Sequence, residues 1–348
     1  MTNAFLDRVG IRHPVVQAPM GGANATPPSL VAAVSNAGAL GFLGAAYMSP
    51  EQITNECTAI RSLTDRPFGL NLFAPTENPD SPGDVDAATA CIARLHGELG
   101  LDPPKPPTLP KHTFEQQLDA ALDGGMSIFS FTFNTLPAET IARVKRRGVY
   151  VVGTATTVEE ARILAALGVD AIAAQGSEAG AHRGTFAGSF ESSMVGTMAL
   201  VPQIVRAVDL PVIASGGIMN GGAIAAAMRL GASAAALGTA FLVADECGVA
   251  ESYKKLVLSS RDDGTRVTRA FSGRPARGIV NRAMTEIESA AAILAYPYQN
   301  SLTREMRTAA AKQDRPEYLS LWAGQGASLA RRMSATALVE TLIREMTS

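Results

Sequence analysis

Residues 150–174 read YVVGTATTVEEARILAALGVDAIAA and contain a complete strand–helix–strand unit. The runs 150–154 and 171–174 are short and apolar, as buried strands are, whereas residues 158–167 have the apolar spacing of an amphipathic helix. A helix between two such strands carries the chain back across the sheet, so the strands run parallel. The stretch therefore predicts a parallel α/β sheet covered by helices.

The same unit recurs in both directions along the chain. Before residue 150 it predicts strands at 15–20, 40–45, 68–73 and 128–133, and helices at 29–37, 50–63, 114–123 and 137–147. After residue 174 it predicts helices at 195–208 and 222–230, and strands at 212–215 and 234–238. Eight strands that alternate with helices over about 240 residues favour a closed (β/α)8 TIM barrel over an open doubly wound sheet.

Two segments fall outside this alternation. Residues 76–112 are rich in proline, and the run PPKPP at 103–107 lacks the backbone donors that a helix interior or a central strand requires. We interpret this segment as an excursion from the loop after the third strand. Beyond residue 243 the pattern turns mostly helical, with helices predicted at 251–258, 286–294 and 335–346. The sequence thus predicts a barrel over residues 1–243 and an appended, mostly helical subdomain over residues 244–348.

The composition excludes several classes of partner. The 348 residues are 47% hydrophobic and 18% charged, with a formal net charge of -2. Lysine and arginine are scattered, so the chain carries no electrostatic footprint for nucleic acid or an anionic membrane. Its three cysteines, Cys57, Cys91 and Cys247, lack metal-ligand spacing, which argues against a metal site and a disulfide framework. The N-terminus has no secretory signal, so we expect a cytoplasmic protein. Whether it forms a homo-oligomer is left open.

A polar loop with several glycines follows the sixth predicted strand and reads QGSEAGAHRG over residues 175–184. In a barrel, functional groups lie at the C-terminal ends of the strands. His182 is the candidate catalytic residue, because the pKa of an imidazole lies nearest neutral pH. Gln175 can both donate and accept hydrogen bonds, and Gly180 lets the backbone approach a flat ligand. The alternative for His182 is a histidine that only caps a turn.

The ends of the last two predicted strands favour a bound phosphate. Backbone N–H groups at glycine turns near a helix start can bind an anion, and barrels commonly hold a phosphate between these two loops. Both turns have the required composition. The candidate residues are Gly216 and Gly217 after the seventh strand, and Ala236, Leu237, Gly238 and Thr239 at the end of the eighth.

Two further strand ends carry residues suited to a ligand. Asn71 is polar within the apolar strand 68–73, and a buried, unpaired amide would cost about 1–3 kcal/mol. Asn71 therefore either bonds neighbouring backbone or recognises a ring with donors and acceptors along its edge. Together with Gln175 it favours an isoalloxazine ring. The first strand adds four candidate contacts, Ala18, Pro19, Met20 and Gly21.

In their order along the chain, these motifs resemble those of the class I nitronate monooxygenases, formerly called 2-nitropropane dioxygenases. The resemblance covers about residues 5–282, and the combination is more specific than any single motif. It implies a TIM barrel that binds FMN non-covalently and uses O2 to oxidise alkyl nitronates, such as propionate 3-nitronate, to a carbonyl product and nitrite. The matching segments are 17–22, 33–41, 71–73, 178–184, 216–218, 230–232, 238–239 and 271–278.

The resemblance also implies a role for each candidate residue. It places Asn71 and Gln175 at the flavin ring with Gly180 beside it, and Gly217 with residues 236–239 at the phosphate. His182 becomes the catalytic residue, which hydrogen-bonds the nitro group of a nitronate and acts as a base if a neutral nitroalkane is used. The flavin performs the electron transfer and the oxygen chemistry. Ala181 departs from the pattern, because related barrels often carry a second glycine before the histidine.

Two other functions remain open at this stage. An FMN-dependent enoyl-thioester reductase or NADH:quinone reductase would share the glycine–histidine loop and the phosphate turns, although Arg183 favours the nitronate interpretation. A non-catalytic barrel that binds a flavin or a phosphorylated metabolite would leave His182 with a structural role. Which nitronate is used, and whether neutral nitroalkanes are substrates, is also open. Tyr296, Tyr298 and Asn300 could line the pocket, but such a cluster is more often a packing element.

Overall fold

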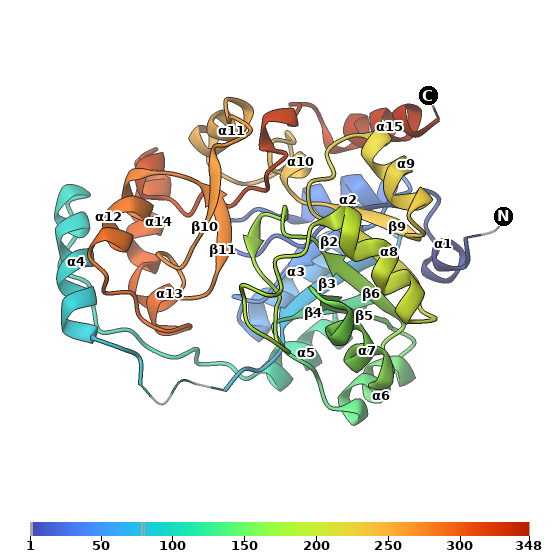
Figure 1. The fold of residues 1–348 in the computed structure, drawn as a ribbon, viewed down its shortest axis with the longest axis horizontal. Coiled ribbons are helices and arrows are strands. Elements are labelled where there is room, and N and C mark those ends of the chain that lie inside the picture. Colours follow the sequence, from blue (N-terminus) through green and yellow to red (C-terminus); the bar gives the residue numbers. More distant parts are fainter. Residues whose placement is uncertain (1–2, 78, 80, 348) are drawn as a thin grey trace.

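Eight parallel strands form the centre of the molecule in this computed structural model, which describes residues 3–77, 79 and 81–347 (Figure 1). Each strand is short and almost entirely buried. The strands are β1 (Val15–Gln17), β2 (Gly41–Gly44), β3 (Phe68–Phe73), β4 (Ile128–Thr132), β5 (Tyr150–Ala155), β6 (Ala171–Gln175), β8 (Val212–Ser215) and β9 (Ala234–Leu237).

The sheet closes on itself between β1 and β2. Its order is β1-β9-β8-β6-β5-β4-β3-β2, and every neighbouring pair is parallel. At the remaining seam the Gln17 N–H donates to the Leu40 carbonyl at 2.9 Å, and the Leu40 N–H donates to Val15 at 3.0 Å. The side chain of Gln17 adds a bond, because its Oε1 accepts from the Phe42 N–H at 3.0 Å. The predicted (β/α)8 barrel is confirmed.

Helices alternate with these strands and cover the outside of the barrel. Side-chain caps begin several of them, and Ser49 with Gln52 and Thr113 with Gln116 form capping boxes. The covering helices are α2 (Pro28–Asn36), α3 (Pro50–Leu63), α5 (Phe114–Asp123), α6 (Ala138–Arg146), α7 (Val158–Ala166), α8 (Thr197–Ala207), α9 (Gly221–Arg229) and the short α10 (Thr239–Leu242).

The hydrophobic core has two parts, as in other barrels. The larger part lies between the strands and the covering helices. The smaller part fills the barrel with side chains such as Val16, Phe42 and Ile213. Phe5 and Val9 of α1 (Ala4–Val9) join this inner cluster and plug one end of the barrel. The open end of the barrel is therefore the opposite one, where the strands have their carboxyl termini.

The proline-rich excursion contains a helix that its composition did not predict. Helix α4 (Val85–Glu98) begins at Asp84, whose side chain accepts from the Ala87 N–H at 2.9 Å. It lies beside α12 (Arg282–Ser289) and α14 (Arg304–Lys312), far from the barrel (Figure 1). Ion pairs join it to α12: Arg94 lies 2.6 Å from Glu286, and Glu98 lies 2.7 Å from Arg282.

The C-terminal third is mostly helical, and it also carries a small antiparallel sheet. Strands β10 (Thr265–Thr268) and β11 (Ala276–Ile279) pair with each other, and β11 pairs with β7 (Ala181–His182) of the barrel loop. The last helix packs on α2 and α9 of the barrel wall. The division at residue 243 stays a prediction. The other elements are α11 (Glu251–Leu258), α13 (Tyr298–Leu302), α15 (Ala335–Met346), and the 3-10 turns η1 (Pro316–Tyr318) and η2 (Ala327–Leu329).

Most predicted elements agree with the structure to within three residues at each end. The largest shift among the helices concerns α12, which was predicted at 286–294 but begins after Asn281. The Asn281 side chain accepts from the Met284 N–H at 3.0 Å, so an asparagine cap starts this helix earlier than the apolar pattern indicates. Strand β1 was predicted to reach Met20 but ends at Gln17, two residues before Pro19, which has no N–H to donate.

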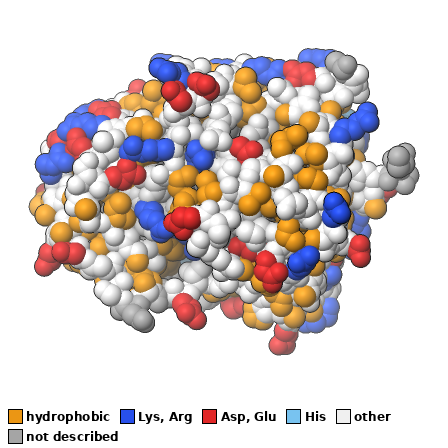
Figure 2. Space-filling view, in the orientation of Figure 1, with side chains coloured by type: hydrophobic (Ala, Val, Ile, Leu, Met, Phe, Trp, Pro, Cys, Tyr) orange, Lys and Arg blue, Asp and Glu red, His pale blue; other side chains and the backbone are white. Residues whose placement is uncertain are grey.

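The visible surface is chemically mixed. Figure 2 shows acidic, basic and hydrophobic side chains interspersed over one face of the molecule, without a large area of a single charge. Within the described residues, no helix is long and apolar enough to cross a membrane.

Candidate active site

A cavity of about 740 Å³ opens at the carboxyl ends of the barrel strands. It brings together nearly all the residues that the sequence predicted for the site. The exception is Leu237, whose side chain is buried in the core, although its carbonyl accepts from the Ala18 N–H at 2.9 Å. The predicted residues that line the cavity are Ala18, Pro19, Met20, Gly21, Asn71, Gln175, Gly180, His182, Gly216, Gly217, Ala236, Gly238 and Thr239.

His182 is held by strand pairing with the C-terminal part of the chain. In β7 it lies opposite Ala276 of β11, and the Arg183 N–H donates to the Pro275 carbonyl at 2.9 Å. The His182 ring nitrogen Nε2 lies 2.8 Å from Ser272 Oγ. Ala181 before it has a φ of 61°, in the left-handed region that glycine adopts more easily. The second glycine common in related barrels would therefore relieve strain at this position.

Aromatic rings surround the imidazole of His182. The ring centroids of Phe133 and Trp322 each lie 5.5 Å from that of His182, and those of Phe73 and Tyr296 lie 6.1 and 6.5 Å away. Burial among these rings, together with the charges of Arg274 and Arg307, lowers the pKa of His182 to about 3. The imidazole is therefore neutral at physiological pH.

Gln175 holds the His182 loop in place. Its Nε2 donates to the His182 carbonyl at 2.9 Å, and its Oε1 accepts from the Gly184 N–H at 2.8 Å. Both ends of the amide thus bind the loop, and one amide hydrogen is left for a ligand in the cavity. The flavin contact expected of Gln175 stays a prediction.

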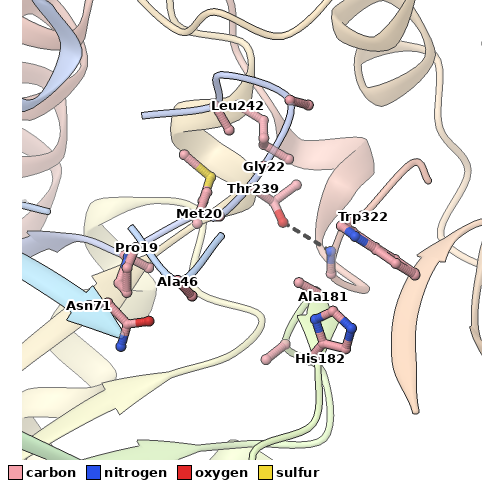
Figure 3. Close-up of a pocket in the computed structure, with 18 of the residues that line it drawn as sticks. Pro19, Met20, Gly22, Ala46, Asn71, Ala181, His182, Thr239, Leu242 and Trp322 are labelled. Carbon is pink, nitrogen blue, oxygen red and sulfur yellow. Dashed lines mark hydrogen bonds between the residues drawn. The ribbon is translucent and has the colours of Figure 1, made fainter. Parts of the chain in front are cut away.

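Asn71 lies across the cavity from His182 (Figure 3). Its Nδ2 donates to Ser130 Oγ of the next strand at 2.9 Å. Among the described residues its Oδ1 has no hydrogen-bond partner, and one amide hydrogen is unused. Asn71 therefore retains both a donor and an acceptor for the edge of a ring.

The two turns predicted to bind phosphate meet at another part of the cavity. Gly216 and Gly217 have φ values of 116° and 71°, which only glycine adopts without strain. Neither Gly217 N–H nor Gly238 N–H makes a backbone hydrogen bond within the described part of the chain. The Thr239 Oγ1 accepts from the Gly324 N–H at 2.9 Å (dashed line in Figure 3), which leaves its own proton available to an acceptor. This donor set fits a phosphate.

The C-terminal segment passes so close to Gly180 that this position has no room for a side chain. A Cβ at this position would lie 2.6 Å from backbone atoms of both Ala323 and Gly324. The Gln325 N–H in turn donates to the Glu178 carbonyl at 2.9 Å. The His182 loop and residues 323–325 are thus in backbone contact, and the C-terminal segment forms part of the wall.

Arg183 holds the His182 loop in place through hydrogen bonds to backbone carbonyls. Its guanidinium donates to the carbonyls of Gln175, Thr156 and Ser193, and its side chain is almost fully buried. Burial lowers its pKa to about 10, and it remains charged at neutral pH. Arg183 therefore supports the site from outside the cavity.

The sequence did not predict the basic residues of helix α14. Arg304, Arg307 and Lys312 line the cavity, together with Asn300 of α13. Arg307 Nη2 donates to the Asn300 side chain at 2.9 Å, and burial lowers the pKa of Arg307 to about 10. Asn300 was considered as a lining residue but not retained, whereas Tyr298 does not line the cavity. Basic residues on a C-terminal helix give no sequence signal that they turn towards the barrel.

The family model and the sequence comparison give the same result. The nitronate monooxygenase family matches residues 3–345. A probable nitronate monooxygenase from Staphylococcus saprophyticus is 39% identical over 340 residues, which cover 97% of this chain and 95% of the relative. One from Staphylococcus aureus strain Newman is 37% identical over 346 residues, covering 99% and 97%.

Solved structures are similar to this chain in fold as well as in sequence. A nitroalkane oxidase from Streptomyces ansochromogenes superposes with a TM-score of 0.89 at 40% identity, covering 99% of this chain and 98% of that chain. FabK from Thermotoga maritima has a TM-score of 0.77 at 26% identity, covering 100% and 96%. The match spans both the barrel and the C-terminal elements that complete the cavity, and this chain belongs to the nitronate monooxygenase family.

Proposed function

We propose that the protein uses FMN and O2 to oxidise alkyl nitronates to a carbonyl product and nitrite. The observation that carries this proposal is the cavity itself, in which a set of phosphate donors and His182 occupy separate parts of one space. A flavin mononucleotide has a phosphate at one end and a reactive ring at the other, so a single cavity with both features suits it. Family membership supports the same conclusion.

The residues present fit an FMN. Gly217, Gly238 and Thr239 would hold the phosphate through N–H and O–H donors that are free within the described chain. Asn71 and Gln175 would meet the ring edge with their unused amide groups. When bound, the flavin supplies the electron transfer and the reaction with oxygen.

The protein's own contribution is to bind and orient the substrate anion. Arg304 and Arg307 line the cavity, and both attract a negatively charged nitronate. The rings of Phe133 and Trp322 contact His182 and limit access of water to it. Because a nitronate is already deprotonated, its oxidation does not require His182 to remove a proton.

The arginines also favour a substrate with a second anionic group. Arg307 is half-buried, is fixed by Asn300 and Thr303, and has no carboxylate partner in the described chain. Partial burial of a cation without a counterion costs free energy, and a ligand carboxylate would compensate this cost. Propionate 3-nitronate has such a carboxylate and is our preferred substrate.

Neutral nitroalkanes form a second class of candidate substrate. A structure 40% identical to this chain is described as a nitroalkane oxidase. For such substrates a base must first remove the proton on the carbon that bears the nitro group, and we assign this role to His182, which lines the cavity.

The visible absorption spectrum of the purified protein tests this proposal. We expect a yellow protein that releases FMN on heating, and whose flavin is bleached by propionate 3-nitronate without oxygen and recovers in air. A colourless protein that takes up no FMN would contradict the proposal.

A further inference from the structure

Ser272, in the segment 271–278, contacts the imidazole of His182, and this contact has had no role so far. Ser272 is 1% exposed, and its Oγ lies 2.8 Å from His182 Nε2. The same oxygen lies 3.1 Å from the Arg274 carbonyl and accepts from the Arg274 N–H at 3.2 Å. One hydroxyl therefore has three neighbours, and it has only one proton to give.

A neutral imidazole carries one proton, either on Nε2 or on Nδ1, and each position gives a different set of hydrogen bonds in this cluster. If His182 carries its proton on Nε2, Ser272 accepts from Nε2 and from the Arg274 N–H, and it donates to the Arg274 carbonyl. All three contacts are then hydrogen bonds. If the proton is on Nδ1, Ser272 must donate to Nε2 instead. The Arg274 carbonyl then loses the one donor it has among the described residues, which makes this the less favourable arrangement.

The second ring nitrogen has different surroundings. His182 lines the cavity, and its Nδ1 makes no hydrogen bond to a described residue. His182 Nδ1 is not among the fully buried, unpaired side-chain atoms of the described residues, whereas His96 Nε2 is one of them. Nδ1 is therefore the nitrogen of His182 that remains accessible from the cavity.

We propose that Ser272 is a positioning residue that holds His182 in the Nε2–H tautomer, so that Nδ1 presents a lone pair to the substrate. Burial and the charges of Arg274 and Arg307 keep the ring neutral, so the second nitrogen stays unprotonated. Tyr296, the other titratable side chain in contact with the ring, holds no negative charge near neutral pH because burial raises its pKa.

This assignment separates two roles for His182, and this step rests on the proposed function. A lone pair on Nδ1 can accept the α-proton of a neutral nitroalkane. The C–H bond breaks, its electron pair stays on the substrate as the nitronate, and the imidazole becomes an imidazolium. A lone pair cannot donate a hydrogen bond to the nitro oxygens of a nitronate. His182 is thus a base for nitroalkanes and gives nitronates no such bond.

Nitrogen-15 NMR of the purified protein with labelled histidine tests the tautomer directly. The His182 signals are assigned by their loss in His182→Asn, and couplings to the ring protons identify the protonated nitrogen. We expect Nε2–H in the wild type, partial conversion to Nδ1–H in Ser272→Ala, and retention of Nε2–H in Ser272→Thr. An Nδ1–H tautomer in the wild type overturns the proposal, whatever the activity.

Kinetics provide a second readout. Loss of one neutral hydrogen bond corresponds to about 0.5–1.5 kcal/mol, so Ser272→Ala should lower kcat/KM for a neutral nitroalkane by about 2- to 10-fold. The value for a nitronate should change less than twofold, Ser272→Thr should restore the nitroalkane rate, and Ser289→Ala on the exposed end of α12 is the control. Equal losses for both substrates would overturn the positioning role. A protein with the Nε2–H tautomer that oxidises neither substrate would contradict only the proposed function.

Discussion

His182 owes its chemical state to its immediate neighbours. Four aromatic rings and two arginines surround it, and together they lower the pKa of its imidazole to about 3. A histidine with this pKa is a weak base, but it is unprotonated at every physiological pH and therefore always available to accept a proton.

Replacement of His182 by asparagine should affect the two substrate classes differently. General-base catalysis contributes about 10²- to 10⁴-fold, which is the expected loss in kcat/KM for a neutral nitroalkane. A nitronate needs no proton removal, and its kcat/KM should fall by at most about tenfold. The measurement compares a nitronate with its parent nitroalkane at matched FMN content. Unchanged values for both substrates would exclude a catalytic role.

The same pKa predicts a pH dependence of stability. A histidine in the unfolded chain titrates near 6.5. Between this value and about 3 the unfolded state binds a proton that the folded state does not, so the free energy of unfolding falls as the pH falls through this window. His182→Asn should make the slope between pH 6.5 and 4 shallower, by up to about 1.4 kcal/mol per pH unit. Urea unfolding at several pH values measures this slope, and identical slopes would show that folding does not lower the pKa of His182.

Ala181 offers a test of backbone strain beside His182, the proposed catalytic residue. Its φ of 61° suits glycine, tolerates alanine at a cost of about 1–2 kcal/mol, and is poor for a β-branched side chain. Ala181→Gly should therefore leave the midpoint of thermal unfolding unchanged or raise it, whereas Ala181→Val should lower it. The reverse order of the two variants would contradict the left-handed conformation.

Among the structural elements, the contact between the His182 loop and residues 323–325 completes the cavity wall. Both Gly180 and Gly324 are needed for it, because a Cβ on Gly180 would lie 2.6 Å from Gly324 N, and one on Gly324 would lie 2.7 Å from the Glu178 carbonyl oxygen. Gly324 also donates to Thr239 of the phosphate region. The C-terminal segment therefore connects the His182 loop to the turns proposed to bind phosphate.

Gly180→Ala should disturb both regions together. The added methyl group must displace backbone, and such overpacking typically costs about 1–3 kcal/mol. We expect weaker FMN retention and a lower midpoint of thermal unfolding. Gly188→Ala in the same long loop is the matched control, because its nearest contact would be the Ser192 hydroxyl at 3.7 Å. Full FMN content and an unchanged midpoint in Gly180→Ala would contradict this close approach.

The sequence predicts elements well where one local signal suffices. The apolar alternation and the capping sequences gave β3, β8, α3, α5, α11 and α15 with the bounds observed. The pairing of β7 with β11 joins residues 181–182 to 276–277, and no local pattern indicates so distant a partner. In the excursion, the prolines obscured α4 although Asp84 is a good cap. Ser272 and Arg307 were missed as site residues for the same reason, because only the folded chain brings them to His182.

In the whole molecule, the barrel supplies the turns proposed to bind phosphate, and the C-terminal third supplies the basic residues and two of the four aromatic rings around His182. Asn71 lies in β3, Gln175 ends β6 and Gly217 lies in the turn after β8. By contrast, Ser272, Arg307 and Trp322 come from residues after the last barrel strand. A motif search within the barrel finds the first group and leaves the second unnoticed. Substrate selection is expected to depend on the second group.

Gly217→Val tests the phosphate region. Its φ of 71° is unfavourable for valine, and the new Cβ would lie 3.3 Å from Glu178 Cβ. We expect at least about a tenfold loss in FMN affinity in a folded protein, because one hydrogen bond to a charged group corresponds to about 1.5–3 kcal/mol. Gly97→Ala, which contacts nothing within 4 Å, is the control for substitution of glycine. Full FMN content in Gly217→Val would place the phosphate elsewhere.

We propose that this barrel oxidises nitronates with oxygen and does not act as a pyridine-nucleotide reductase. The most direct test follows oxygen uptake and nitrite release together when propionate 3-nitronate is added to the purified protein, and separately adds NADH without oxygen. We expect oxygen consumption accompanied by nitrite, and no rapid bleaching of the flavin by NADH. Rapid bleaching by NADH, with neither oxygen uptake nor nitrite from the nitronate, would contradict the claim and identify a reductase.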